Sequence, residues 1–403
     1  MSITLKPTTL DELRDAVAWA AAEESRLEIV GQGTKRGWGR PMQTTHTLDV
    51  SALTGVRLYE PEELVLTAAA GTPLAEIESL LTANRQALAF EPPDFGALFG
   101  SGSAGTLGGA IACNLAGPRR IRSGAARDHF LGFTGVSGRG EEFKAGGRVV
   151  KNVTGYDLPK LLAGSFGTLA AISEATLKVM PAPEKSRTVL VYGLDAPAAV
   201  AAMAEALNSP FDVSGAAYLP QAVAARSGVE YLRRNSASVI AARIEGTGTS
   251  VGVRTSALRT LLASRGAIEE LHTMNSVVFW REVRDVAPLL PDRAAAIWRI
   301  SVPPTAGPRI AGVLGAADHF FDWGGGLIWA AVPAAGDAGA SAIRATIGEN
   351  GGHASLMRAP EPLRAVVDVF EPRTEALALL TNRVKDAFDP RRILNPGRMY
   401  AGL

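Results

Sequence analysis

Apolar and polar positions at the start of the chain alternate in a way that predicts one helix followed by one strand. Thr9 and Glu12 have the spacing of a capping box, and the apolar residues over 10–20 recur at the period of a single helix face. A short apolar run at 27–30 then predicts a strand, which stops at Gly31.

Two further strand signals and a second helix follow. The runs at 47–50 and 64–70 predict strands, and Gly71 separates the second of them from the helix. Thr72 has the residue type of an N-cap, and Pro73 suits the first position of that helix. This alternation of strand and helix predicts an α/β architecture for the opening segment.

The pattern then changes to that of a hairpin. Residues 130–136 predict a strand, 137–140 a tight turn and 142–144 the returning strand. A further strand at 171–180 ends at the Pro-Ala-Pro sequence of 181–183, which cannot continue a ladder. We therefore predict a domain linker at that position.

After this linker, strand and helix patterns alternate. The predicted strands lie at 188–194, 213–219, 238–245, 297–302 and 327–332. The predicted helices lie at 196–207, 250–265, 306–316 and 337–349. Two such βαβ-like sets predict an α+β domain with an antiparallel sheet. A last helix pattern at 377–388 ends at Asp389-Pro390, and Asn395-Pro396-Gly397 predicts a turn.

Composition narrows the class of protein. The 403 residues suffice for two or three domains, and the interspersed acidic and basic residues leave a formal net charge of +1. This balance argues against nucleic acid or an anionic membrane as the main partner. Cys113 is the one cysteine, so no intrachain disulfide can form, which fits a reducing cytosol. The first residues lack a signal-peptide pattern and the longest apolar stretches are too short to span a bilayer, so we expect a soluble, cytoplasmic protein.

The distribution of glycine indicates candidate binding segments, because the 43 glycines cluster in a few parts of the chain. The first of these, Gly31 to Gly39, reads GQGTKRGWG and directly follows a predicted strand. Closely spaced glycines let backbone N–H groups converge on an anion such as a pyrophosphate, whereas a loop of ordinary tight turns is the alternative. The spacing matches neither the dinucleotide-binding fingerprint nor a P-loop.

The second glycine-rich segment, residues 100–120, has the features of a helix start. Thr106, Gly108 and Gly109 offer a hydroxyl and exposed amides, and Asn114 and Gly117 follow them. Such a helix N-terminus suits a phosphate or the edge of a flavin. A small-residue helix packed tightly against a sheet is the alternative. The segment continues into a basic loop that either neutralises phosphate or faces solvent or a partner, with Arg119, Arg120, Arg122 and Arg127.

The third segment, residues 151–173, contains two loops around a short predicted helix. The sequence Thr-Gly-Tyr-Asp at 154–157 precedes that helix. A second loop, with Gly164, Gly167 and Thr168, leads into the strand that contains Ile172. Each of the three segments is weak evidence alone, so their order along one chain is the informative feature.

In order and spacing, the three segments resemble the FAD-binding domain of the vanillyl-alcohol oxidase family, which has the PCMH-type fold. The resemblance covers residues 1–181 and returns at FDPRRILNPGRMY, residues 388–400. It implies an α+β fold with a PCMH-type two-subdomain FAD-binding domain at 1–181 and a ferredoxin-like α+β cap domain at 187–350. A C-terminal segment at 351–403 would return to the flavin and pack on the FAD domain.

The resemblance also implies which residues would bind FAD. Binding is expected to be non-covalent, because the first glycine loop lacks the His or Cys that tethers flavin in some relatives, and Cys113 is expected to be a buried structural thiol. A pyrophosphate cradle is implied for Gly31, Gln32, Gly33, Thr34 and Lys35. The flavin and its ribityl chain would lie along Thr106, Gly108, Gly109, Asn114 and Gly117. The remaining pocket would be formed by Gly155, Tyr156, Gly164, Gly167, Thr168, Ile172 and Asn395.

Within this family, the phrases GTLGGAIACNLAGPRR, KNVTGYDLPKLLAG and GGHASLMRAP are especially similar to the FAD-binding E subunits of bacterial glycolate oxidases. This implies a subunit that takes part in oxidising glycolate to glyoxylate, with a sister FAD subunit and an iron–sulfur subunit as partners. One cysteine cannot hold a cluster, so electrons would pass to those partners, and the protein would reach the inner membrane only through them. Phe166 and Ala170 depart from the family pattern, at positions where an acidic residue and a glycine are common.

Oxidation of a 2-hydroxy acid requires a cation for the carboxylate and a base for the hydroxyl proton. The five histidines include no closely spaced pair, so no metal site is expected. His353 as the base with Arg358 as the carboxylate clamp is the remaining candidate, against a structural role for a lone histidine. Two other functions stay open: a self-sufficient FAD-dependent oxidase or dehydrogenase of another 2-hydroxy acid or alcohol, and a non-catalytic assembly subunit with a structural flavin.

Overall fold

The computed structural model describes residues 3–148 and 155–403, and the chain divides into two compact units. Unit 1 comprises Met1–Ala116, Gly124–Pro181 and Pro372–Leu403. Unit 2 comprises Gly117–Ser123 and Ala182–Glu371. The end of the chain therefore returns to the unit formed by its beginning, and a short part of the second glycine-rich segment belongs to unit 2.

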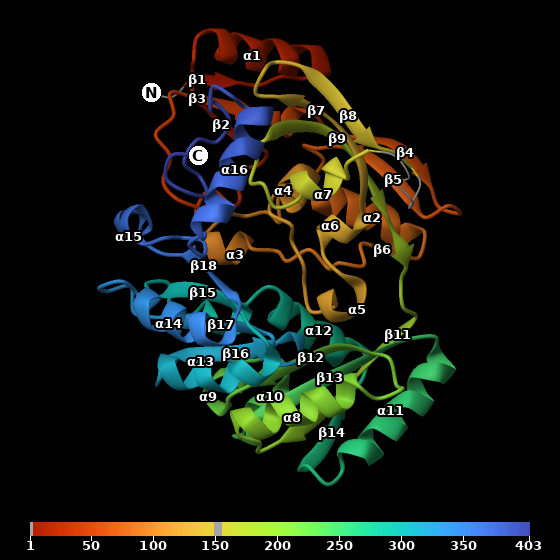
Figure 1. The fold of residues 1–403 in the computed structure, drawn as a ribbon. Coiled ribbons are helices and arrows are strands. Elements are labelled where there is room, and N and C mark those ends of the chain that lie inside the picture. The colour runs from red at the N-terminus through yellow and green to blue at the C-terminus, as the bar shows by residue number, and fades with distance from the viewer. Residues whose placement is uncertain (1–2, 149–154) are drawn as a thin grey trace. The chain divides into compact units, whose positions relative to one another are not determined.

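The first part of unit 1 is a three-stranded parallel sheet in the order β1-β3-β2 (Figure 1). Its elements are β1 (Ile3–Leu5), α1 (Leu10–Ala22), β2 (Leu27–Val30), β3 (His46–Asp49) and the 3-10 helix η1 (Val50–Ala52). Leu13 of α1 and Leu27 of β2 are fully buried in one core with Ile393 and Leu394. The predicted α/β opening is therefore present, and residues far along the sequence complete its core.

The second part of unit 1 is a five-stranded antiparallel sheet in the order β4-β5-β9-β7-β8. Its strands are β4 (Val56–Glu60), β5 (Val65–Ala69), β7 (Phe130–Ser137), β8 (Glu142–Gly146) and β9 (Ala170–Lys178), and a separate pair joins β6 (Gln86–Ala87) to β10 (Met180–Pro181). The helices of unit 1 beyond α1 are α2 (Leu74–Ala83), α3 (Gly96–Phe99), α4 (Leu107–Ala112), α6 (Ala126–His129), α7 (Leu158–Leu162) and α16 (Glu375–Phe388). The two sheets are the two subdomains expected of this unit.

Unit 2 is built on one eight-stranded antiparallel sheet in the order β14-β11-β13-β12-β16-β17-β15-β18. Its strands are β11 (Lys185–Tyr192), β12 (Val213–Leu219), β13 (Val239–Gly246), β14 (Ala267–Leu271), β15 (Ala296–Ser301), β16 (Asp318–Asp322), β17 (Leu327–Val332) and β18 (His353–Arg358). Its helices are α5 (Arg120–Ser123), α8 (Ala196–Leu207), α9 (Gln221–Ala224), α10 (Glu230–Asn235), α11 (Gly248–Leu262), α12 (Thr273–Arg284), η2 (Ala287–Leu289), η3 (Pro304–Ala306), α13 (Gly307–Leu314), η4 (Trp323–Gly325), α14 (Ala340–Asn350) and α15 (Glu361–Val366). Each set of four consecutive strands has the 4-1-3-2 order of a ferredoxin-like fold, so the expected ferredoxin-like domain is present as two halves joined between β12 and β16.

The unit boundaries differ in one respect from the expected domains. The chain leaves unit 1 after Pro181, at the proline-rich linker, but returns to it at Pro372 instead of residue 351. The reason is β18, whose ladder with β15 keeps this stretch in the sheet of unit 2. Several elements of unit 2 had no prediction from the sequence pattern, among them β14, α12, β16 and β18.

Two predicted helix caps differ in detail from the structure. Thr9 accepts a hydrogen bond from the backbone N–H of Glu12, and the Glu12 carboxylate accepts from the backbone N–H of Thr8 as well as that of Thr9, so the capping box includes one more residue than predicted. Helix α2 has Pro73 at the N-cap, because the Thr72 hydroxyl instead accepts a hydrogen bond from the N–H of Gly55. Among the described residues, no helix combines the length and the apolar character needed to cross a membrane.

Candidate functional site

A cleft in unit 1 brings together the glycine-rich segments that the sequence predicts as a binding site. The cleft has a volume of about 820 Å³, counting the solvent at its mouth. Eleven predicted binding residues line it: Gly31, Gln32, Gly33, Thr34, Lys35, Thr106, Gly108, Gly109, Gly167, Ile172 and Asn395. Segments that are distant in sequence thus converge on one concave surface.

Glycine is required in the first loop because other segments approach it closely. A Cβ at Gly31 would lie 2.5 Å from the Thr106 hydroxyl oxygen. A Cβ at Gly105, which also has a φ of +94°, would lie 2.6 Å from the Thr34 hydroxyl and 2.7 Å from Lys35 Nζ. Side chains at Gly31 and Gly105 would therefore push the first two glycine segments apart and displace the Lys35 ammonium.

Lys35 places a buried positive charge in the cleft. Its Nζ donates hydrogen bonds to the Thr34 hydroxyl at 3.1 Å and to the Ala104 carbonyl at 3.2 Å. In the part of the chain that the structure describes, no carboxylate forms an ion pair with it. Burial lowers the pKa of this ammonium, an effect opposed by the nearby Cys113 and Asp94. A buried cation without an ion pair is one that a bound anion would stabilise.

The second glycine segment forms the opposite wall of the cleft. Thr106 is the N-cap of α4 and accepts a hydrogen bond from the N–H of Gly109. Gly108 lies against β5, where a Cβ would approach the Ala70 side chain to 2.8 Å. Because α4 is only 6 residues long, its dipole is small and the anion preference of the cleft rests on Lys35 and the loop amides. Both readings of this segment apply: the small residues pack against the sheet, and they also line the cleft.

Several predicted binding residues lie outside this cleft. The Asn114 side chain accepts a hydrogen bond from the N–H of Arg127 at 3.0 Å, so it joins α4 to α6. Gly117 belongs to unit 2, where its carbonyl accepts a hydrogen bond from the Trp323 indole at 3.1 Å. Gly164 donates from its backbone N–H to the carbonyl of Ile111, which shapes the loop before β9 without placing it in the cleft lining.

The segment before α7 also points away from the cleft lining. Tyr156 is 91% exposed and lines a separate shallow surface with residues of α7 and α16. Gly155 next to it has a φ of +81° and space around its Cβ position. Thr154, the first residue of the predicted loop, lies outside the described residues. The structure therefore does not bring Gly155 and Tyr156 together with the first two glycine segments.

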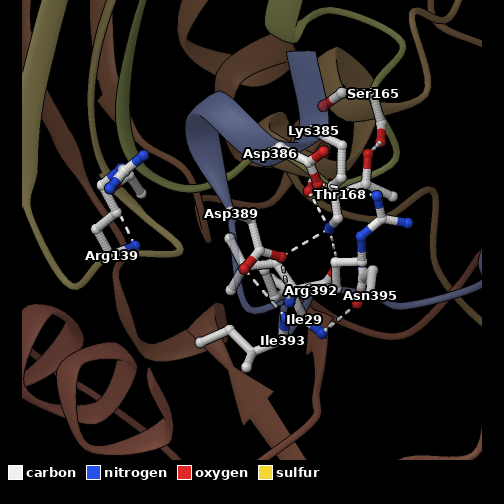
Figure 2. A network of polar contacts seen from close by, with 12 residues as sticks. Ile29, Arg139, Ser165, Thr168, Lys385, Asp386, Asp389, Arg392, Ile393 and Asn395 are labelled. Atoms are coloured by element: carbon white, nitrogen blue, oxygen red, sulfur yellow. Dashed lines mark hydrogen bonds and ion pairs between the residues drawn. The ribbon is translucent and has the colours of Figure 1, made fainter. Parts of the chain in front are cut away.

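Asn395 connects the C-terminal segment to two walls of the cleft (Figure 2). Its side-chain oxygen accepts a hydrogen bond from the N–H of Ile29 at 2.7 Å, and its amide nitrogen donates to the carbonyl of Phe166 at 2.6 Å. Asn395 itself has a φ of +44°, a conformation that asparagine tolerates better than most residues. Asn395 thus ties β2 to the loop before β9 while it lines the cleft.

A buried ion pair also holds the C-terminal segment that carries Asn395, as Figure 2 shows. Lys385 Nζ donates to Asp389 at 2.7 Å, to the Thr168 carbonyl at 2.6 Å and to the Leu394 carbonyl at 2.9 Å. The Asp389 carboxylate in turn accepts hydrogen bonds from the backbone N–H groups of Ile393 and Leu394. Thr168 therefore contributes through its carbonyl to the support of the cleft and not to its lining.

Among the residues that line the cleft without having been predicted to bind are Arg398, Phe166, Ser165 and Cys113. Arg398 is buried and donates to the carbonyl of Lys35 at 2.7 Å. Phe166 has a φ of +54°, and its ring meets Trp38 edge to face at 4.8 Å. Ser165 lines the cleft beside it, and so does Cys113. Cys113 lies at the end of α4, where the residue is partly exposed to the cleft while burial raises the pKa of its thiol.

His353 and Arg358 are not brought together. His353 begins β18 and Arg358 ends it, which separates them by roughly 17 Å at about 3.4 Å per residue. The Arg358 guanidinium donates to the carbonyls of Asp292 and Ala295, so it holds a loop of unit 2. Arg358 therefore cannot clamp a small carboxylate that His353 contacts. Partial burial and the charges of Arg299 and Arg120 lower the pKa of His353.

Metal ligands do not gather in the described residues. No group of three or more His, Cys, Asp or Glu side chains is placed to hold a metal ion within 3–148 and 155–403. The fit of the cleft to a dinucleotide therefore depends on glycine loops, a buried lysine and apolar walls.

Comparison with known proteins agrees with this geometry. Residues 1–146 match the family model of an FAD binding domain. The chain is 34% identical over 391 residues to glycolate oxidase subunit GlcE of Escherichia coli (strain K12), covering 97% of each chain. It is also 34% identical over 134 residues to glycolate oxidase subunit GlcD of Bacillus subtilis (strain 168), covering 33% of this chain and 27% of that one.

Solved structures share the fold at low sequence identity. p-Cresol methylhydroxylase with substrate bound matches at a TM-score of 0.71 and 13% identity, covering 99% of this chain and 88% of that one. 4-Ethylphenol oxidase from Gulosibacter chungangensis matches at a TM-score of 0.70 and 15% identity, covering 99% and 89%. Since the match to the Escherichia coli subunit extends over nearly the full length of both chains, this protein belongs to the GlcE family of PCMH-type FAD-binding proteins.

Proposed function

We propose that the chain is the FAD-binding subunit of a glycolate oxidase complex and takes part in oxidising glycolate to glyoxylate. The observation that carries this proposal is the 34% identity to glycolate oxidase subunit GlcE across 97% of both chains. The local similarity to subunit GlcD supports a complex in which related flavin subunits act together. An iron–sulfur subunit is proposed as the onward electron carrier, because one cysteine cannot hold a cluster.

The residues of the cleft fit FAD, held without a covalent bond. The loop amides of 31–35 and the Lys35 ammonium would hold the pyrophosphate, since Lys35 has no carboxylate partner among the described residues. The small residues of the second segment, Thr106, Gly108 and Gly109, would admit the flat ring and its ribityl chain. Gly167, Ile172 and Asn395 would complete the walls. When bound, FAD supplies a two-electron acceptor.

The reaction sets simple requirements on the protein. Glycolate loses one hydride equivalent from its α-carbon and one proton from its hydroxyl, which yields glyoxylate. The protein must hold the carboxylate, accept the hydroxyl proton and exclude water from the reacting carbon. The two electrons must then leave through partner subunits, because this chain has one cysteine and cannot hold an iron–sulfur cluster of its own.

The absorbance spectrum of the purified chain, recorded anaerobically before and after glycolate, tests the proposal. Flavin bands that bleach only with dithionite, and with glycolate once the partner subunits are added, are the expected result. Bands that bleach with glycolate in the isolated chain would favour a self-sufficient dehydrogenase. A colourless chain that takes up no added FAD would contradict flavin binding itself.

A further inference from the structure

One face of the unit 2 sheet carries a group of polar side chains that the flavin cleft does not use. Arg299 and Ser301 are two residues apart on β15, so their side chains lie on the same face of the sheet. Their partners on β18 are Ser355 and His353, and paired residues share a face. We call these four residues, with Arg120, the Arg299 face.

Arg299 lacks the partners that a guanidinium normally has. Burial, with the charge of Arg120 second, lowers the pKa of Arg299 to about 10, so it stays charged at neutral pH. Its guanidinium lies 5.0 Å from the centre of the Trp323 ring, but within residues 3–148 and 155–403 no hydrogen bond or ion pair is formed by it. Five N–H donors are thus held in place and left unused by the protein.

A second guanidinium is held on the same ring. Arg120 lies 4.9 Å from the centre of the Trp323 ring. Its neighbours in the chain fix it there: Arg119 forms a two-pronged ion pair with Glu245, at 2.7 Å and 2.9 Å, and Arg122 pairs with Asp212 at 2.7 Å. Arg119 and Arg122, two members of the basic loop expected from the sequence, therefore hold the neighbouring Arg120 in unit 2.

The turn that carries the Trp323 ring, which lies near both guanidiniums, has a left-handed backbone. Trp323 has a φ of +52°, and Gly324 and Gly325 after it have φ values of +68° and +101°. The Trp323 indole donates to Gly117, and the buried Asp322 carboxylate accepts from the N–H of Trp323 at 2.7 Å. Asp322 balances one of the two arginine charges, so the face keeps an excess of positive charge.

We propose that the Arg299 face binds the carboxylate of a small 2-hydroxy acid. The planar guanidinium of Arg299 can donate two parallel hydrogen bonds to a carboxylate, and Arg120 supplies a second positive charge. The hydroxyls of Ser301 and Ser355 and the neutral ring of His353 would receive the hydroxyl group. The identity of the acid as glycolate rests on the proposed function, whereas the anion site rests on the unused donors of Arg299.

A carboxylate fits this face better than a phosphate does. The Asp322 carboxylate lies close enough to influence Arg299, and it would repel a dianion more strongly than a monoanion.

The test is equilibrium binding of glycolate to the full-length FAD-loaded chain, measured by calorimetry in a low-salt buffer. We expect Arg299→Gln to weaken glycolate binding about 10- to 100-fold, the effect of losing a charge-assisted hydrogen bond. Arg299→Lys should recover part of the affinity, because it restores the charge without the planar fork. Arg233→Gln, which changes an exposed arginine of α10, is the matched control and should bind as the parent does.

Arg120→Gln is a second variant, for use if the Arg299 variants fold poorly. It should fold well, because it removes a positive charge that repels Arg299. We expect it to weaken binding as well, with an unchanged melting temperature by circular dichroism. Parent-like affinity in folded Arg299→Gln and Arg120→Gln chains would overturn the site. Inorganic phosphate that binds more tightly than glycolate would overturn the carboxylate assignment, and acetate that binds equally well would overturn recognition of the hydroxyl. Arginine-dependent binding with no flavin bleaching, even after the partner subunits are added, would contradict the proposed oxidation while leaving the anion site intact.

Discussion

Lys35 is the residue on which the electrostatics of the flavin cleft depend. Its ammonium is buried and solvated by the Thr34 hydroxyl and the Ala104 carbonyl. We expect Lys35→Met to raise the dissociation constant for FAD about 10- to 100-fold, because a charge-assisted contact to the pyrophosphate is lost. Titration of the apoprotein with FAD, followed by flavin fluorescence, measures this. Lys144→Met, at an exposed lysine of β8, should leave the constant unchanged, and equal constants for both variants would contradict the role.

The same residue gives the apoprotein a pH dependence of defined sign. Burial lowers the pKa of Lys35 from its ordinary 10.5. At pH values between the lowered pKa and 10.5, the unfolded chain therefore binds more protons than the folded chain. The free energy of unfolding therefore increases, through Lys35, as the pH rises towards 10.5, so the folded apoprotein becomes more stable. Urea unfolding of the apoprotein between neutral and alkaline pH should show this slope in the parent relative to Lys35→Met. A parent that loses stability faster than the variant over that range would disagree with the burial of this charge.

At the residue scale, the sequence predicts glycines better than isolated polar side chains. Gly31 and Gly108 lie so close to other backbone or side-chain atoms that a Cβ would not fit. Such positions require glycine, and glycine can be recognised directly in the sequence. His353 and Arg358 are close in sequence, but a strand of known rise sets them far apart. Arg398 lines the cleft from a distant segment, and no local pattern marks that contact.

Helix α16 acts on the cleft through one buried pair. Lys385 and Asp389 are four residues apart, and their side chains are 2% and 0% exposed. We expect Lys385→Met to cost about 3–5 kcal/mol in the free energy of unfolding, because it leaves the Asp389 carboxylate buried without its counter-charge. The loop that carries Thr168 loses its anchor in this variant, so FAD affinity should fall together with stability.

Urea unfolding and FAD titration of the Lys385→Met chain measure these two effects. The control is Lys160→Met, which breaks an ion pair with Asp157 that is 44% and 40% exposed. Exposed pairs contribute about 0–1 kcal/mol, so this variant should unfold near the parent. Losses of the same size in both variants would contradict a special role for the buried pair.

At the element scale, strands with simple alternation or flanking turns were predictable, whereas others, such as β16 and β18, were not. The run at 213–219 coincides with β12, and 327–332 with β17. β16 and β18 instead carry charged or polar residues at their ends, such as Asp318 and His353. These residues shorten the apolar stretch from which a strand is predicted. Their pairing within the sheet, and not their own sequence, makes them strands.

The whole molecule consists of two units with separate cores, and each should respond to its own substitutions. Leu394 is fully buried in unit 1 and Leu258 is fully buried in unit 2. We expect Leu394→Ala to cost about 2–5 kcal/mol and to lower hydrogen-exchange protection across residues 3–116 and 372–403. Protection of the eight-stranded sheet should stay as in the parent.

Leu258→Ala is the matched substitution and should give the reverse pattern. Mass spectrometry of exchanged peptides distinguishes the two outcomes residue range by residue range. Loss of protection throughout the chain in both variants would mean that the two units unfold as one.

At the scale of the whole molecule, the first boundary was predictable and the second was not. Pro181 and Pro183 mark the linker because proline cannot continue a ladder. The return to unit 1 at Pro372 depends on β18 pairing with β15, a long-range contact without a local signal. The placement of Gly117 in unit 2 likewise depends on its hydrogen bond from Trp323.

The core of unit 1 has a consequence for the order of events during synthesis. Leu27 bonds through its backbone to Ile393 and Asn395, and the residues between them include the whole of unit 2. The ribosome therefore completes the eight-stranded sheet before it makes the residues that close the first sheet. We therefore expect flavin capture to be one of the last steps of biogenesis, because Asn395 and Arg398 of the cleft are synthesised after unit 2.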